Sequence, residues 1–71
     1  MIPWNKIAEL LERRRKRWRR HAEISHGKSR MLAAGNRHAE AEIEAREALK
    51  AETRIRELDE LEVEIIAEAW L

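Results

Sequence analysis

Apolar side chains recur along the first half of the chain at intervals of three, four and seven residues. Such intervals place side chains on one face of a helix, because an α-helix has 3.6 residues per turn. Pro3 suits the first turn of a helix, where its missing N–H group is not needed. The pattern predicts a helix over about 3–34 whose apolar face is made of Trp4, Ile7, Ala8, Leu11, Trp18, Ala22 and Ser25.

A similar pattern predicts a second helix over about 37–70. Glutamate precedes arginine by four residues at Glu42 and Arg46, and again at Glu52 and Arg56, which is the favourable order for ion pairs on a helix. No stretch alternates between apolar and polar residues as a strand does. The apolar face of this second helix consists of Ile43, Ala48, Ala51, Ile55, Leu58, Leu61 and Ile65.

Two glycines are candidates for the turn between these helices. Gly35 followed by Asn36 suits a helix C-terminus and the N-cap of the next helix, and a turn at 35–36 gives two helices of similar length. A turn at Gly27 is the alternative, and it would leave a shorter first helix and a second helix of about 40 residues. We favour the turn at 35–36.

An antiparallel hairpin with this turn would place residue i near residue 70 − i. Large apolar residues would then meet at the end of the hairpin that holds the two chain termini, and small residues would meet near the turn. Two helices leave part of each apolar face uncovered, and a second hairpin usually covers it. We therefore predict an all-α fold, an antiparallel helical hairpin that forms a single domain over 1–71 and is completed as a dimeric four-helix bundle. Its helix-packing or oligomer seam would contain Trp4, Ile7, Leu11, Trp18, Ile43, Ile55, Leu58, Leu61 and Ile65.

Charge divides the chain into two unlike halves. Residues 1–37 contain eleven Lys or Arg against three Glu, whereas residues 38–71 contain four against eleven acidic residues. The net charge of +1 hides this difference. A chain of 71 residues has a small core, and without cysteine it has no disulfide to stabilise that core, so oligomerisation is the expected route to stability.

The densest positive charge lies between residues 12 and 20. In the predicted register this block faces Lys50–Leu58, which contains three further cations, so it would stay uncompensated. A helical row of arginines binds phosphates or carboxylates, and basic clusters do not by themselves distinguish these partners. The predicted partner-binding or phosphate-binding residues are Arg13, Arg14, Lys16, Arg17, Arg19 and Arg20.

Other kinds of site are not expected. The run Ala22–Ser29 matches a loose form of the phosphate-binding loop but lacks the strand and glycines that such a loop needs. His21 and His26 are five residues apart, which does not suit a zinc pair on a helix, so we expect no metal or other cofactor. No nucleophile has a plausible base and orienting acid, so an enzyme is not expected. Membrane association is also not expected, because the second helix covers the same apolar face, and the predicted location is the cytoplasm.

The leading functional hypothesis is a small non-enzymatic binding protein that self-associates, preferably as a homodimer, and docks on a larger protein with an acidic surface. Its size and simplicity are typical of a regulator or inhibitor encoded by a phage or mobile element. The alternatives are RNA or DNA binding through the Arg13–Arg20 block, and a structural subunit of a larger helical assembly in which basic and acidic helices alternate.

Overall fold

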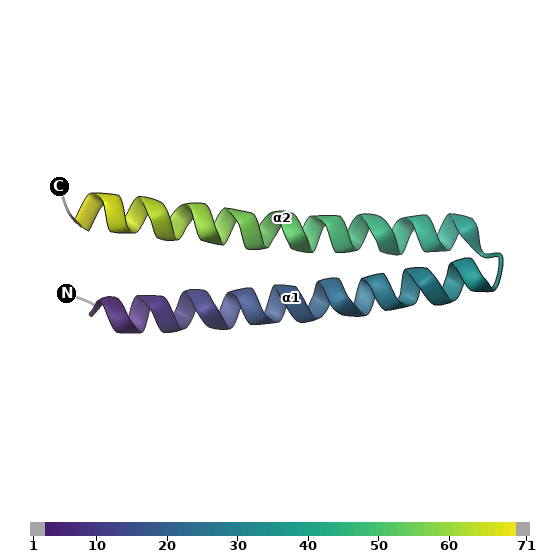
Figure 1. Cartoon of the computed structure of the whole chain (residues 1–71), viewed down its shortest axis with the longest axis horizontal. Helices are drawn as coiled ribbons and strands as arrows, with labels where there is room; N and C mark the ends of the chain where they lie inside the picture. The colour runs from purple at the N-terminus through teal and green to yellow at the C-terminus, as the bar shows by residue number, and fades with distance from the viewer. Residues whose placement is uncertain (1–2, 70–71) are drawn as a thin grey trace.

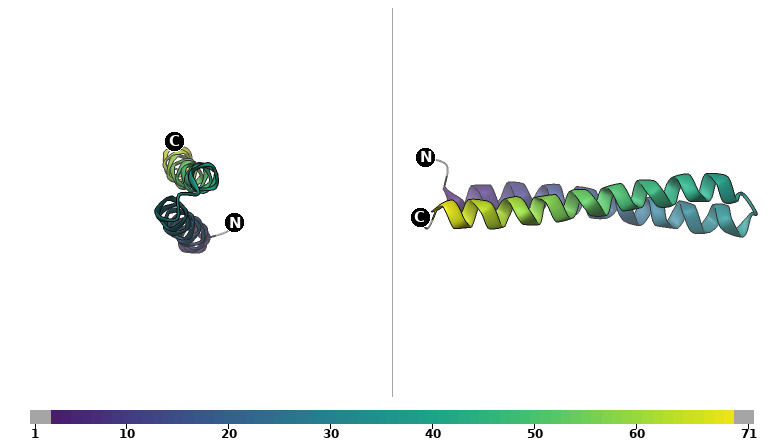
Figure 2. Two further views of the ribbon diagram at one scale, coloured as in Figure 1. Left: turned by 90° about the vertical axis from the view of Figure 1, so that its right-hand side faces the viewer. Right: turned by 90° about the horizontal axis from the view of Figure 1, so that it is seen from above.

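The structure, a computed structural model that describes residues 3–69, is a hairpin of two antiparallel α-helices (Figure 1). Helix α1 is Trp4–Ala34 and helix α2 is His38–Ala69. The helices lie side by side along their whole length and cross at a shallow angle (Figure 2), and they form a rod of 53 × 17 × 12 Å. The predicted all-α helical hairpin is therefore confirmed. No helix within residues 3–69 is long and apolar enough to cross a membrane.

The chain reverses over residues 35–37, and Gly27 lies inside α1. Asn36 N–H donates to Ala33 O at 3.1 Å, and Arg37 N–H donates to Leu32 O at 2.8 Å. These two bonds form a Schellman motif, in which the residue after the helix C-cap is left-handed. That residue is Asn36, with φ of 62°, whereas Gly35 has φ of −88°. The prediction of Asn36 as the N-cap of α2 was wrong, because Arg37 O accepts the first bond of that helix.

We predict that alanine at position 35 is tolerated and that a β-branched residue at position 36 is not. A Cβ at position 35 would lie 3.7 Å from two carbonyl oxygens, which is ordinary contact, so Gly35→Ala should retain the wild-type stability. Asn36→Val should lower the free energy of unfolding by about 1–2 kcal/mol, because the left-handed region is costly for a β-branched residue. Urea denaturation monitored by circular dichroism measures the free energy of unfolding of both variants. Equal losses for the two variants would contradict this assignment.

Long side chains, unlike short ones, pair across the hairpin several residues further from the turn than predicted. Near the turn, Ser29 Oγ donates to Ala41 O at 2.8 Å, as the predicted register requires. Further along, Arg15 contacts Asp59 and Glu62 rather than residues near Ile55. Side chains on a helix lean toward its N-terminus. Long side chains that meet across antiparallel helices can therefore start from Cα atoms that lie a few ångströms apart along the rod.

The buried seam follows a strict spacing of three and four residues in both helices, as in a coiled coil. Its fully buried members are small, apart from Leu11, so the helices pack through alanine along much of their length. Two charged residues occupy seam positions that the apolar pattern had left empty, Arg15 in α1 and Glu62 in α2. The buried residues are Leu11, Ala22, Ser25, Ala41, Ala48 and Ala51.

The predicted seam residues fall into three groups. Leu11 is buried. Ile7, Trp18, Ile55, Leu58 and Ile65 are half-buried. Trp4, Ile43 and Leu61 are exposed in the single chain, at 43%, 57% and 44%. The hairpin thus leaves large apolar side chains on its surface, among them Leu10, Ile24, Met31, Leu49, Val63 and Ile66.

Candidate functional site

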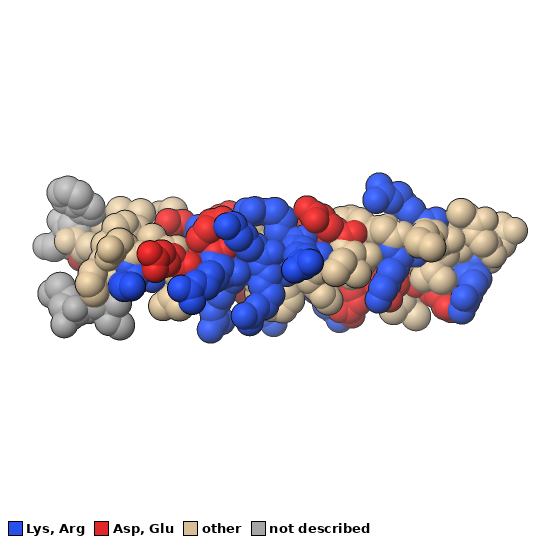
Figure 3. Space-filling model, turned by 90° about the horizontal axis from the view of Figure 1, so that it is seen from below, with Lys and Arg blue, Asp and Glu red and all other residues tan. Residues whose placement is uncertain are grey.

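A band of positive charge crosses the middle of the rod on the α1 side (Figure 3). Six exposed cations of α1 form it, and we call them the basic belt. They follow one another over two helical turns, so they point in several directions around α1 and extend about 11 Å along it. The residues of the basic belt are Arg13, Arg14, Lys16, Arg17, Arg19 and Arg20.

The belt cations differ from most other cations of the chain in having no carboxylate partner among residues 3–69. Elsewhere, most exposed cations pair with acids one helical turn away, such as Arg46 with Glu42 at 2.9 Å and Arg54 with Glu57 at 3.1 Å, whereas Lys28, Arg30 and Arg56 have no such pair within the described residues. Glu9 and Glu12 lie one turn before Arg13 and Lys16 but pair instead with Lys6 and Arg15. Arg14 and Arg17 have no acid within one turn on α1, because the helix has none between Glu12 and Glu23. The belt is therefore charge that the fold does not use internally.

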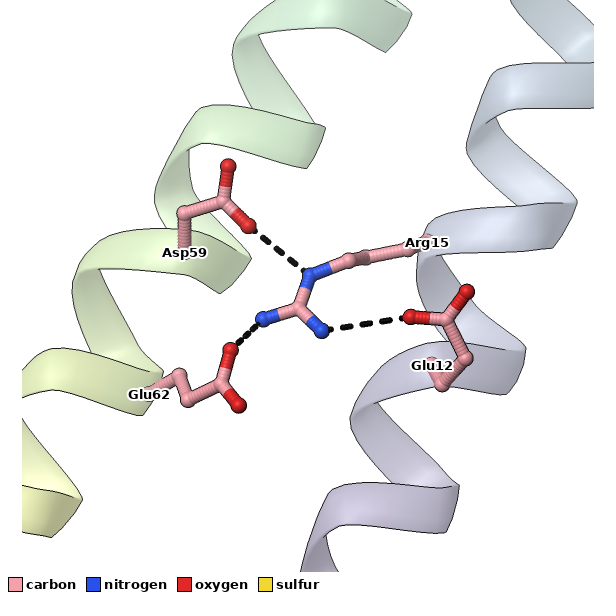
Figure 4. Close-up of polar contacts among 4 residues, drawn as sticks. All are labelled: Glu12, Arg15, Asp59 and Glu62. Atoms are coloured by element: carbon pink, nitrogen blue, oxygen red, sulfur yellow. Dashed lines mark hydrogen bonds and ion pairs between the residues drawn. The ribbon is translucent and has the colours of Figure 1, made fainter.

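Arg15 lies within the same stretch but belongs to the seam (Figure 4). Its Nε donates to Asp59 Oδ1 at 2.8 Å, its Nη2 donates to Glu62, and its Nη1 lies 3.4 Å from Glu12 Oε2. The Arg15 side chain is 12% exposed and that of Glu62 is 29% exposed. Arginine has a planar fork of donors, which suits it to hold three carboxylates at once.

These contacts shift the pKa of Arg15 upward. Burial disfavours the charged guanidinium, but the hydrogen bonds from Glu62, Asp59 and Glu12 and the charge of Glu62 outweigh it and raise the pKa of Arg15. A raised pKa stabilises the fold at every pH below the ordinary value for arginine, and this contribution is lost only in strong alkali. Arg15 therefore remains a permanent link between the helices at physiological pH.

The two long edges of the rod differ. On one edge, ion pairs bridge the helices at Arg15 and at His26, whose Nε2 lies 2.8 Å from Glu52 Oε1. On the other, which we call the open edge, a groove of about 250 Å³ runs between the helices near their free ends. Arg14 stands beside this groove, and the groove continues past Trp18 toward Arg54. Its apolar lining consists of Ile7, Leu10, Leu11, Leu58, Leu61 and Ile65.

The histidines and the glycine-containing run of α1 make no ligand site within residues 3–69. His21 packs edge-on against Trp18, with ring centroids 5.9 Å apart, and His26 pairs with Glu52. No group of three or more His, Asp or Glu side chains in this part of the chain is arranged to hold a metal ion. The run 22–29 is continuous helix, so its backbone N–H groups are bonded within α1.

Comparisons with protein-family models, with curated proteins and with solved structures find no match to this chain. The surfaces of the hairpin are therefore interpreted from their own chemistry. Sequence reasoning missed the role of Arg15, although one signal was present. The apolar face skips from Leu11 to Trp18, and a seam with spacing of three and four needs a member at position 15.

Proposed function

We propose that this protein is a small non-enzymatic binding protein whose basic belt docks on an acidic surface of a larger protein, and that it acts as a regulator or inhibitor by occupying that surface. The observation that carries the proposal is the contrast between the belt and the paired cations around it. Six cations that no carboxylate of residues 3–69 neutralises stand together on rigid helix. Such a patch raises the association rate with a negatively charged partner.

The extent of the belt favours a protein over a nucleic acid. Acids of α1 border it at both ends, Glu9 and Glu12 on one side and Glu23 on the other. A nucleic acid duplex carries a charge about every 1.7 Å along its axis, so a strand lying along the rod would meet these carboxylates. An acidic protein patch has a bounded footprint and matches a bounded belt. Arginine also forms bidentate pairs with carboxylates.

The test compares two triple variants that remove the same charge. Arg13→Gln with Lys16→Gln and Arg20→Gln removes half of the belt, and Arg30→Gln with Arg46→Gln and Arg56→Gln is the matched control. We expect the full chain to capture protein partners from cell extract, and this capture should persist after nuclease treatment. The belt variant should capture at least about ten times less of these partners. The control should retain it.

Two outcomes would contradict the proposal. Equal capture by both triple variants would show that the belt has no part in docking. Loss of all capture after nuclease treatment, together with direct binding of a purified RNA or DNA duplex that weakens steeply with salt, would assign the belt to nucleic acid instead.

A further inference from the structure

The open edge carries a second row of side chains along each helix, outside the buried seam. In both helices the row is spaced by three and four residues, which places its side chains on one face of the helix. Large apolar residues stand at both ends of each row, and most of the residues between them are charged. The row of α1 is Ile7, Leu10, Arg14, Arg17, His21, Ile24, Lys28 and Met31, and that of α2 is Ile43, Glu47, Lys50, Arg54, Glu57 and Leu61.

We propose that the open edge is the seam of a homodimer in which two hairpins lie side by side with their turns at the same end, so that α1 of each faces α2 of the other. This assignment deepens the self-association predicted from the sequence, and it stands independently of the docking proposed above. A two-fold axis along the rod then generates a four-helix bundle in which every helix is antiparallel to both of its neighbours. The interface is isologous, since the same edge is used by both copies.

Charge distinguishes this arrangement from the flipped one. Helix α1 contains ten Lys or Arg and three Glu, and α2 contains four Lys or Arg and eleven Asp or Glu. Turns at the same end place the basic helix of each copy against the acidic helix of the other. Hairpins flipped end to end about an axis across the rod would instead place α1 on α1 and α2 on α2, like charge on like charge, which is unfavourable.

The apolar residues of the two rows lie at matching levels in the proposed pair. With a rise of 1.5 Å per residue measured from the turn, Leu10 lies at about 39 Å and Leu61 at about 36 Å. Near the turn, Met31 lies at about 8 Å and Ile43 at about 9 Å. The α1 row of one copy therefore meets the α2 row of the other with apolar contacts at both ends of the rod. These four side chains are between 44% and 77% exposed in the single chain.

Between these apolar contacts, opposite charges lie at matching levels. Arg17 lies at about 29 Å from the turn and Glu57 at about 30 Å, and Lys28 lies at about 12 Å and Glu47 at about 15 Å. Ile24 lies level with Lys50, whose aliphatic stem can cover it. The dimer would bury Arg14 and Arg17 in its seam and leave Arg13, Lys16, Arg19 and Arg20 outside it. The same belt can therefore serve the dimer and an outside partner.

The test begins with the wild-type chain. Light scattering after gel filtration should give twice the chain mass of 8.5 kDa. Leu61→Glu should weaken the dimer at least about tenfold, because a carboxylate would be buried in an apolar seam. The matched control is Val63→Glu, at a residue that is 65% exposed on the opposite edge, and it should leave the dimer intact. Circular dichroism of Leu61→Glu separates loss of dimer from loss of helix.

Orientation is tested with a spin label at Ala34→Cys, the only cysteine in that variant. Turns at the same end predict a label separation of roughly 20–30 Å, since neighbouring helix axes are about 10 Å apart. The flipped dimer places the labels at opposite ends of a 53 Å rod. Three results would contradict the proposed dimer seam. They are a wild-type chain that stays monomeric at high concentration, a dimer that Leu61→Glu does not weaken, and a long distance between the labels. A dimer that captures no acidic partner would overturn the docking proposal alone.

Discussion

Replacing Arg15 with methionine should lower the free energy of unfolding by about 2 kcal/mol. The substitution keeps the helix propensity and nearly the length of the side chain, but it removes the cation that pairs with Glu12, Asp59 and Glu62. Those carboxylates would then face one another without compensation, and Glu62 would stay largely covered. Breaking a buried pair costs about 3–5 kcal/mol, and the smaller figure here reflects the 58% exposure of Asp59. Urea denaturation at fixed protein concentration measures the loss.

The matched control is Arg13→Met, since Arg13 is exposed and has no ion pair among residues 3–69. It should change stability by less than about 0.5 kcal/mol. A double variant, Arg15→Met with Glu62→Met, should recover most of the stability lost in Arg15→Met, because an apolar pair needs no compensation. Similar stability for Arg15→Met and Arg13→Met would mean that the carboxylates around Arg15 are satisfied by water instead.

The hairpin could be predicted from the sequence because its main determinants are local. Apolar periodicity specified both helices, and the absence of other turn signals left only Gly27 and Gly35 to compare. A glycine inside a helix and a glycine at a turn look alike in one sequence, yet Asn36 next to Gly35 distinguished them. The identity of the left-handed residue was not predictable from propensity, since both glycine and asparagine adopt that conformation.

The polar part of the seam was harder to predict than the apolar part. Arg15 stands among seven other cations between residues 6 and 20, and composition gives no reason to separate it from its neighbours. Its position in the seam separates it, since it lies at the spacing of three and four between Leu11 and Trp18. A buried charged pair of this kind fixes register, because a slip along the seam would leave the guanidinium without partners.

The charge asymmetry of the chain therefore divides into distinct roles. The charge of Arg15 is neutralised within the hairpin by ion pairs with Asp59 and Glu62. In the proposed dimer, the excess charge of α1 is met by the acidic α2 of the second copy. The part of the belt that neither the fold nor the proposed dimer neutralises is Arg13, Lys16, Arg19 and Arg20. These cations remain unpaired within residues 3–69 of the folded hairpin and in the proposed dimer, so they are available to an acidic partner.

Leu11→Ala should be the most destabilising single truncation of an apolar side chain in residues 3–69, with a loss of about 3 kcal/mol. Leu11 is 6% exposed, and the other buried apolar residues of this part of the chain are alanines. It faces Leu58, Leu61 and Ile65 across the groove, so truncation would enlarge a space that the helices already leave open. Stability for a chain of this size is about 4–10 kcal/mol, so the loss is a large fraction of it. The melting temperature should fall by about 12–24 °C.

The matched control is Leu49→Ala, the same chemical change at a residue that is 57% exposed on α2 and lies outside the buried seam. Alanine and leucine are both strong helix formers, so the comparison isolates packing from helix propensity. Both variants should be melted at the same concentration, because dimerisation couples stability to concentration. A loss for Leu11→Ala no greater than that for Leu49→Ala would mean that alanine packing and the Arg15 contacts hold the helices together without a large apolar residue. The dependence on concentration would then identify how much of the stability comes from the second copy.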